Sequence, residues 1–251
     1  MAKSDRPPLY ETPWLYESLF HPGLQDLGFY GPWALACQGP VLELGCGTGR
    51  LLWPLKKTGV PVEGLDASPA MLQACREEGE RLGLDAPLHA GDWRDFDLGR
   101  RFAGIYLPFN GLQHLQSAAD LGAFFERVRA HLEPGGRFAL DLHLPQATLL
   151  ARDPDERYGV EEGPVGPKGE RVIAEQSRYD ALTQVLEQTW TLALPDGNTQ
   201  PLSLSLRQFF PQELKNLLAA QGFEILRHEG GFERESLGNQ SLKQVVEARL
   251  L

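Results

Sequence analysis

Short apolar runs alternate with helix-like segments between residues 40 and 143, and this alternation restricts the fold more than any other feature of the chain. The apolar runs are short enough to be strands and cover residues 40–44, 60–66, 87–92, 102–108 and 137–144. The helical segments are expected at residues 50–57, 69–82 and 119–132. Strands that alternate with helices form a mostly parallel sheet with helices on both faces. The sequence therefore predicts an α/β fold.

The pattern changes between residues 170 and 210, where no helical periodicity is present. Trp190, Leu192 and Leu194 alternate with polar or small residues, and the Pro-Asp-Gly-Asn sequence at 195–198 is a strong turn signal. This alternation is typical of antiparallel strands with one solvated face. The expected elements then return to the first pattern, with a helix from Pro211 to before Gly222 and strands at 223–229 and 242–250.

These patterns divide the chain into three parts. Residues 1–38 form an N-terminal cap segment that is rich in aromatic side chains. Residues 39–150 and 208–251 form the α/β core, and residues 151–207 form an antiparallel β insertion. Such an insertion is expected to act as a lid over a pocket, and an interface with a second subunit is the alternative.

The composition limits the class of protein. The chain has 251 residues and a formal net charge of −10, which argues against a passive grip on nucleic acid. No run of about 18 apolar residues is present, so no membrane span is expected. Cys37, Cys46 and Cys75 form no CxxC pair, which favours a reducing compartment. We expect a cytoplasmic protein that is a monomer or a homodimer.

The sequence VLELGCGTGR at residues 41–50 combines a buried strand with a glycine-rich loop. Its glycines follow the pattern G-x-G-x-G, with the acidic Glu43 two residues before the first. A dinucleotide fingerprint requires a glycine where Arg50 stands, and a P-loop requires a Gly-Lys-Ser/Thr ending that is absent. The loop alone is weak evidence for any ligand, so the rest of the α/β unit has to agree with it.

Two aspartates follow the next two strands at the matching edge of the sheet. Asp66 ends the second strand, and a carboxylate there can accept hydrogen bonds from both hydroxyls of a ribose. Asp92 ends the third strand, where a base would lie, and Trp93 supplies apolar area beside it. The glycine loop, the aspartate expected to bind a ribose and the aspartate expected to lie beside a base therefore follow three successive strands at the same edge of the sheet.

Five motifs in this order resemble the class I S-adenosylmethionine-dependent methyltransferases: VLELGCGTGR, VEGLDASPAML, AGDWRDF, IYLPFNGLQHL and LEPGGRFALDL. The resemblance covers about residues 40–144. It implies a Rossmann-like, seven-stranded sheet whose last strand is antiparallel, with S-adenosyl-L-methionine as cofactor and S-adenosyl-L-homocysteine as product. The residues expected to line the cofactor site are Glu43, Gly45, Cys46, Gly47, Asp66, Ala67, Asp92, Trp93 and Leu107. The resemblance also indicates a small-molecule methyl acceptor.

The sequence defines the binding site of the methyl acceptor less closely than the cofactor site. Asn110 and His114 follow the fourth strand, where many methyltransferases contact their substrate, although Leu107-Pro108-Phe109-Asn110 lacks the polar residue and second proline of the base- and amide-methylating subfamilies. Asn110 is alternatively a helix cap. His143 is a candidate general base at the end of the fifth strand, as is His114. No acidic cluster for octahedral metal ligation is present, so no metal is expected.

Further candidate site residues are aromatic or basic and lie in the N-terminal segment or where the insertion meets the core. Tyr16 and Tyr30 are expected to close over the cofactor from the N-terminal segment. Arg207 and Phe209 lie where the insertion returns to the core, and either line the acceptor pocket or seat the lid. The alternatives to a small-molecule methyltransferase are a non-catalytic protein that binds S-adenosylmethionine or its product, and a nucleic-acid or protein methyltransferase.

Overall fold

The computed structural model describes residues 8–20, 23–161, 163 and 165–251. A seven-stranded sheet forms the body of the molecule, in the order β10-β11-β5-β4-β1-β2-β3. Its strands are β1 (Val41–Leu44), β2 (Val62–Asp66), β3 (Leu88–Ala90), β4 (Phe102–Leu107), β5 (Leu132–His143), β10 (Phe223–Glu229) and β11 (Lys243–Leu250). Only β11 pairs antiparallel with both of its neighbours, so the expected sheet is confirmed.

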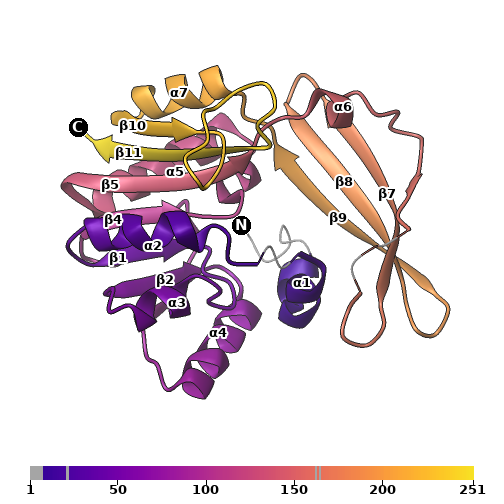
Figure 1. Ribbon diagram of the computed structural model, residues 1–251, viewed down its shortest axis with the longest axis horizontal. Helices are drawn as coiled ribbons and strands as arrows, with labels where there is room; N and C mark the ends of the chain where they lie inside the picture. The colour runs from indigo at the N-terminus through magenta and orange to yellow at the C-terminus, as the bar shows by residue number, and fades with distance from the viewer. Residues whose placement is uncertain (1–7, 21–22, 162, 164) are drawn as a thin grey trace.

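Helices cover both faces of this sheet (Figure 1). One face carries α2 (Leu27–Ala36), α3 (Leu52–Lys57) and α4 (Pro69–Leu82), and the other carries α5 (Ala118–His131) and α7 (Pro211–Ala220). Short helical turns occur at η1 (Pro8–Glu11), α1 (Pro13–Phe20), η2 (Gly111–His114) and α6 (Ala147–Leu150). No helix in the described part of the chain has both the length and the apolar surface that a bilayer crossing requires.

Local sequence sets the bounds of α4. Ser68 is extended and its hydroxyl accepts a hydrogen bond from the Met71 amide at 3.2 Å, which caps the helix, and Pro69 occupies the first helical position. Gly83 ends the helix with φ +67, a left-handed conformation that glycine adopts without strain. The predicted helix at 69–82 is confirmed to the residue because both of its ends are encoded locally.

The end of α5 differs from the prediction. The helix stops at His131, before the Pro-Gly-Gly sequence at 134–136 that was expected to end it. Leu132 is already extended and pairs with Phe102 of β4, so β5 starts there and passes through an irregularity in its pairing. Pairing with a neighbouring strand therefore takes precedence over the local stop signal.

The insertion forms a second sheet of four antiparallel strands, larger than the two alternating runs of the sequence suggested. Its strands are β6 (Tyr158–Gly159), β7 (Arg171–Asp180), β8 (Val185–Ala193) and β9 (Thr199–Arg207), in that order. The expected turn at 195–198 joins β8 to β9. The β7 strand was not resolved in the sequence because its residues mix charged and apolar side chains on both faces.

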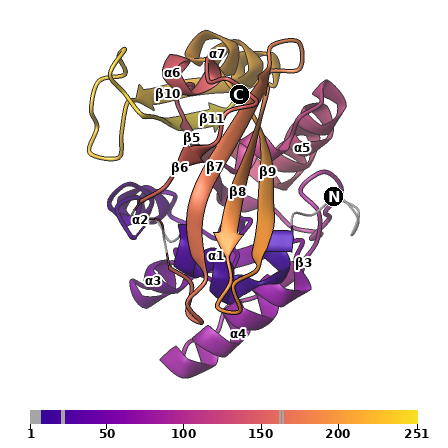
Figure 2. The ribbon, with the colours of Figure 1, turned by 90° about the vertical axis from the view of Figure 1, so that its right-hand side faces the viewer.

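Of the N-terminal segment, α1 lies between the two sheets, whereas α2 covers the main sheet (Figures 1 and 2). Leucines from this segment pack on the apolar face of the second sheet, in one cluster that contains Leu9, Leu15, Leu19, Val172, Leu192 and Leu202. Residues 1–7 and 21–22 of the predicted cap segment lie outside the described residues. The second sheet therefore holds the N-terminal segment in place by apolar burial.

Replacement of Leu192 by alanine tests this packing. Leu192 is 2% exposed in the cluster, so Leu192→Ala is expected to lower the free energy of unfolding by about 2–5 kcal/mol. Leu182→Ala, in the turn between β7 and β8, is the control, because Leu182 is 96% exposed, and a change within about 0.5 kcal/mol is expected. Urea denaturation measures both. Equal effects of the two variants would contradict the packing described.

Candidate functional site

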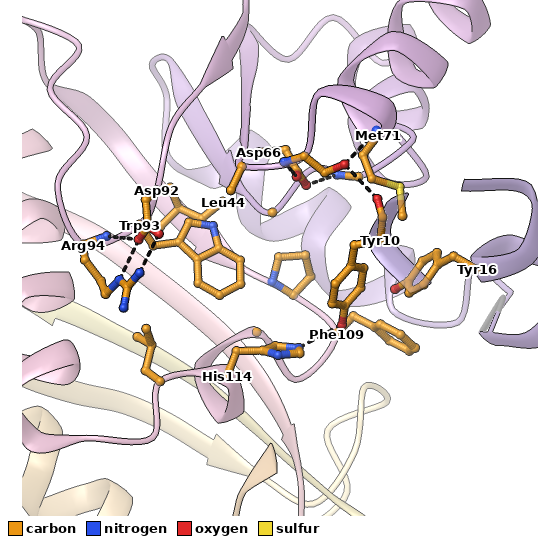
Figure 3. Close-up of a pocket in the computed structure, with 17 residues that line it drawn as sticks. Tyr10, Tyr16, Leu44, Asp66, Met71, Asp92, Trp93, Arg94, Phe109 and His114 are labelled. Carbon is orange, nitrogen blue, oxygen red and sulfur yellow. Dashed lines mark hydrogen bonds and ion pairs between the residues drawn. The ribbon is translucent and has the colours of Figure 1, made fainter. Parts of the chain in front are cut away.

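An open cavity lies at the carboxyl ends of the parallel strands, under the N-terminal segment (Figure 3). It brings together eight of the residues that the sequence singled out: Tyr16, Gly45, Gly47, Asp66, Ala67, Asp92, Trp93 and His114. This edge of an open α/β sheet is where ligands bind in such folds, because the loops that follow the strands leave a crevice there. The cavity is the candidate site.

The glycine loop after β1 is shaped by its backbone. Gly45 has φ +69, and a Cβ there would lie 2.8 Å from the Trp93 ring, so any other residue would displace that side chain. Gly47 has φ +54 and nothing lies within 4 Å of a Cβ built on it, so its backbone is open to the cavity. Glycine is therefore required at the two positions for different reasons. At position 45 it allows Trp93 to approach closely, and at position 47 it leaves room for a ligand.

The carboxylate of Asp66 is fixed by two backbone amides. It accepts hydrogen bonds from the Gly47 amide at 2.8 Å and from the Ser68 amide at 2.8 Å. The first bond ties the end of β2 to the glycine loop after β1, and the second holds the start of α4. Asp66 is thereby held at the cavity wall in one orientation, which suits recognition of a ligand with neighbouring hydroxyl groups.

Asp92 forms part of an ion-pair network with Arg94. The Arg94 side chain donates to the Asp92 carboxylate at 2.9 and 2.8 Å and reaches Asp120 of α5 at 2.8 Å. Arg94 also lines the cavity, and sequence analysis did not single it out. Asp92 is thus oriented by a cation, as Asp66 is oriented by amides, and both carboxylates lie along the same crevice.

Aromatic rings form the wall opposite the acidic residues. Tyr10 lies 5.6 Å from Tyr16 and 5.7 Å from His114, and Trp93 lies 6.2 Å from His114, measured between ring centroids. Tyr16 also contacts Phe109 edge to face at 6.4 Å. The faces of aromatic rings attract cations, so the cavity suits a ligand that combines hydroxyl groups with a positive charge.

His114 is partly buried against this wall and is neutral at physiological pH. Burial lowers the pKa of its imidazole to about 4, because a charged ring would lose its hydration there. Its Nε2 lies 3.1 Å from the Tyr10 hydroxyl, and burial raises the pKa of Tyr10 well above its ordinary value. The pair is therefore an uncharged hydrogen-bonding unit, and its imidazole is too weak a base to keep a proton at neutral pH.

Three of the expected cofactor residues lie behind the cavity wall. Glu43, Cys46 and Leu107 are buried and do not line the cavity. Burial raises the pKa of Glu43 to about 8, and its carboxyl accepts a hydrogen bond from the Tyr106 hydroxyl at 2.8 Å. These residues shape the loop from beneath, and the structure shows no contact of their side chains with the cavity.

The turn after β4 is held by a buried carboxylate. Phe109 and Asn110 have φ +53 and +63, a conformation that is rare for a phenylalanine. The Asp141 carboxylate accepts from the Phe109 amide at 2.8 Å, the Tyr30 hydroxyl at 2.8 Å and the Lys243 ammonium at 3.3 Å. Burial raises the pKa of Asp141, and the Lys243 charge opposes that shift. The network fixes the strained turn that presents Phe109 to the cavity.

This network corrects three expectations about individual residues. Tyr30 is fully buried and binds Asp141, so it does not reach the cavity. Asn110 precedes η2 at its N-cap position, but its side chain accepts from the His143 amide at 2.6 Å and makes no capping hydrogen bond. His143 is exposed at the end of β5 and does not line the cavity. A one-dimensional pattern shows that these residues lie near the sheet edge but not which way each side chain points.

Arg207 and Phe209 seat the second sheet on the core. Phe209 is fully buried in the main hydrophobic cluster. Arg207 donates to Glu213 of α7 at 2.9 Å and to the carbonyl of Gln116 at 3.1 Å. Neither lines the cavity, so of the two predicted roles the structure supports seating. These contacts place β9 beside the end of η2, the position expected for a lid.

Several lining residues were not singled out from the sequence. They are Tyr10, Leu44, Ser68, Met71, Arg94, Pro108, Phe109, Gly111 and Leu115. Ser68 caps α4 and Met71 lies in its first turn, two and five residues after Asp66, so their sequence position is a usable signal. Tyr10 had no signal beyond its aromatic character. Within the described residues, no group of three or more His, Cys, Asp or Glu side chains is arranged to hold a metal ion.

Comparison with known proteins agrees with this geometry. Residues 41–136 match the sequence family described as methyltransferase domain. The chain is 44% identical over 96 residues to the dTDP-3-amino-3,6-dideoxy-alpha-D-glucopyranose N,N-dimethyltransferase of Streptomyces fradiae, an alignment that covers 38% of this chain and 36% of that relative. The chain thus spans about a third of the length of that relative.

Two solved structures resemble the whole described fold. The CcbJ methyltransferase of Streptomyces caelestis has a TM-score of 0.81 and 26% identity, over 96% of this chain and 98% of that one. CalS10 of Micromonospora echinaspora, an amino pentose methyltransferase solved with S-adenosylmethionine bound, has a TM-score of 0.68 and 25% identity, over 94% and 97% of the two chains. The similarity includes the second sheet, because it extends well beyond residues 41–136.

Removal of the Asp141 carboxylate tests the network that holds the turn. Asp141→Ala leaves Lys243, Tyr30 and the Phe109 amide without their acceptor, and we expect a loss of about 3–5 kcal/mol in the free energy of unfolding. Asp180→Ala on the exposed end of β7 is the control. Urea denaturation measures both, and a loss below about 1 kcal/mol for Asp141→Ala would show that the turn is held by other contacts.

Proposed function

We propose that this chain, which has the class I S-adenosylmethionine-dependent methyltransferase fold and a methyltransferase domain at residues 41–136, transfers a methyl group from S-adenosylmethionine to a small molecule. One observation carries the proposal: the Asp66 carboxylate is fixed beside the open backbone of Gly47, at the crevice of the sheet. A loop with this opening and no phosphate-binding lysine suits a nucleoside that lacks phosphates.

The cavity residues suit each part of that cofactor. Asp66 would accept hydrogen bonds from the ribose hydroxyls, and Asp92 with Trp93 would hold the adenine. The open space beside Gly47, whose own amide donates to Asp66, would leave room for the amino-acid part. When bound, S-adenosylmethionine supplies a methyl group that its sulfonium has already activated. The remaining work of the protein is to orient the acceptor and to exclude water.

The aromatic wall is assigned to the reacting end of the cavity. Tyr10, Tyr16 and Phe109 form a cluster of rings beside His114, and such rings stabilise a positive charge. The N-terminal segment supplies two of these rings and is itself covered by the second sheet. The segment and the sheet together would close the site against water, which is the lid function expected of residues 151–207.

The acceptor we propose is an amino group on a small, sugar-like molecule. The Streptomyces fradiae relative is named an N,N-dimethyltransferase of an amino sugar nucleotide, and CalS10 is named an amino pentose methyltransferase. A partly aromatic cavity is compatible with this class, because apolar faces of sugar rings pack on aromatic side chains. A protein that binds S-adenosylmethionine without turnover remains the alternative of a different class.

His114 would orient the acceptor and would not act as a general base for it. Its pKa of about 4 leaves the imidazole neutral, so it can hydrogen-bond to an amine together with the Tyr10 hydroxyl. An amine must be unprotonated to attack, and with so weak a base nearby it would lose its proton to solvent before the site closes. The methylated product would leave as an ammonium ion. His143 is not part of this proposal, since it does not line the cavity.

The cellular location, the class of acceptor and the oligomeric state belong to the same proposal. Cys37, Cys46 and Cys75 are free thiols, which supports a reducing, cytoplasmic environment. The net charge of −10 supports a small-molecule acceptor over nucleic acid. We propose a monomer or a homodimer, since the described fold contains its candidate cavity within one chain.

Ligand binding tests the cofactor assignment. Calorimetric titration is expected to show binding of S-adenosylmethionine and S-adenosylhomocysteine but not of NAD. Asp66→Ala is expected to weaken both by about tenfold or more, because a charge-assisted hydrogen bond contributes about 1.5–3 kcal/mol. Asp95→Ala is the control, since Asp95 is exposed and does not line the cavity. Tight NAD binding with no response to the sulfur compounds would refute the assignment.

The pH dependence of turnover tests the role of His114. We expect the rate to rise with pH and its midpoint to follow the pKa of the acceptor amine, because His114 with a pKa of about 4 stays neutral across that range. His114→Ala should lower the rate and leave the midpoint in place. Rates with two acceptor amines of different pKa measure this. A common midpoint near pH 6.5 that His114→Ala abolishes would instead identify the histidine as the base.

A further inference from the structure

A second cavity lies on the face of the main sheet that carries α2. It shares no lining residue with the first cavity. Its walls come from α2, from the strands β5, β10 and β11, and from the loop between β10 and β11. That loop lies beside α2 in both ribbon views (Figures 1 and 2).

The walls of this second cavity carry an excess of positive charge. Arg137, Arg227 and Arg234 line it together with a single carboxylate, Glu247. Glu247 is 7% exposed and lies 3.0 Å from Arg137 and 3.5 Å from Arg227, measured between charged atoms. Three guanidinium groups thus face one carboxylate, in a chain whose net charge is −10.

Arg234 is the least compensated of the three arginines. It forms no ion pair with any residue in the described ranges. Its backbone has φ +67, a conformation that costs free energy in a residue other than glycine. The neighbouring Glu233 and Glu235 are exposed and do not line the cavity, and the Glu235 carboxylate accepts from the Glu233 amide at 2.8 Å. Arg234 is exposed too, but unlike these two glutamates it lines the cavity.

Aromatic side chains provide the apolar part of the same walls. Phe29 of α2 and Phe232 of the loop lie 6.5 Å apart between ring centroids, and Trp33 also lines the cavity. Lys243 lies 5.2 Å from the Phe232 ring, and its charge is paired with the Asp141 carboxylate. Guanidinium groups bind carboxylate and phosphate oxygens with two parallel hydrogen bonds, and aromatic side chains pack against flat apolar rings.

We infer that this second cavity is a binding site for a small oxyanion attached to a flat apolar body, such as an aromatic carboxylate or phosphate. The oxyanion is held by Arg227 and Arg234, and the apolar body packs against Phe29 and Phe232. The inference does not depend on the proposed methyltransferase activity, because the two cavities are lined by different residues.

Titration with simple probes tests the site on the full chain. Benzoate and phenyl phosphate are expected to bind, and benzyl alcohol and benzylamine to bind at least about tenfold more weakly. Arg234→Gln is expected to weaken the anions about tenfold or more without a change in melting temperature, because Arg234 holds no partner in the described fold. Arg76→Gln, an exposed arginine of α4, is the matched control and should leave affinity within about twofold.

Ionic strength and a second variant complete the test. Binding of the anions should weaken as salt rises, since exposed charges are screened beyond about 8 Å at physiological ionic strength. Arg227→Gln should act like Arg234→Gln. Absence of anion binding at millimolar concentration, equal binding of benzyl alcohol, or an equal loss in Arg76→Gln would each overturn the inference.

Discussion

The structure depends on one buried carboxylate, that of Asp141. It joins α2 through Tyr30, the turn after β4 through Phe109, and β11 through Lys243. A buried charge is tolerated only where such partners replace its lost hydration. Because Asp141 lies near the end of β5, between β4 and β11, these bonds connect the helical layer, the antiparallel edge of the sheet and the cavity. They hold the strained turn that forms the aromatic end of the cavity.

The candidate site divides into a rigid half and a covered half. The glycine loop, Asp66 and Asp92 belong to the parallel sheet and are fixed by backbone amides and by Arg94. The tyrosines belong to the N-terminal segment, which is held by the second sheet through apolar contacts. Hydrogen bonds of fixed geometry suit the recognition of one invariant cofactor. Apolar contacts slide and reopen at lower cost, which suits the exchange of an acceptor and its product.

The sequence predicts the parts of this structure that local signals encode. Ser68, Pro69 and Gly83 bound α4 because caps and left-handed positions are local, and the glycine loop with Asp66 and Asp92 follows from the strand period. The Asp141 network joins residues 32 to 111 positions apart, so no local pattern shows it, and Tyr30, Asn110 and His143 were therefore assigned to the cavity. Tyr10 was missed for the same reason: the second sheet, distant in sequence, decides where the N-terminal segment lies.

The most direct test of the central claim is an experimental structure of the full chain with S-adenosylhomocysteine. The account predicts the ribose hydroxyls on the Asp66 carboxylate, the base beside Asp92 and Trp93, and the sulfur facing the rings of Tyr10, Tyr16 and Phe109. Binding of the molecule in another place, or a ribose that makes no contact with Asp66, would contradict it.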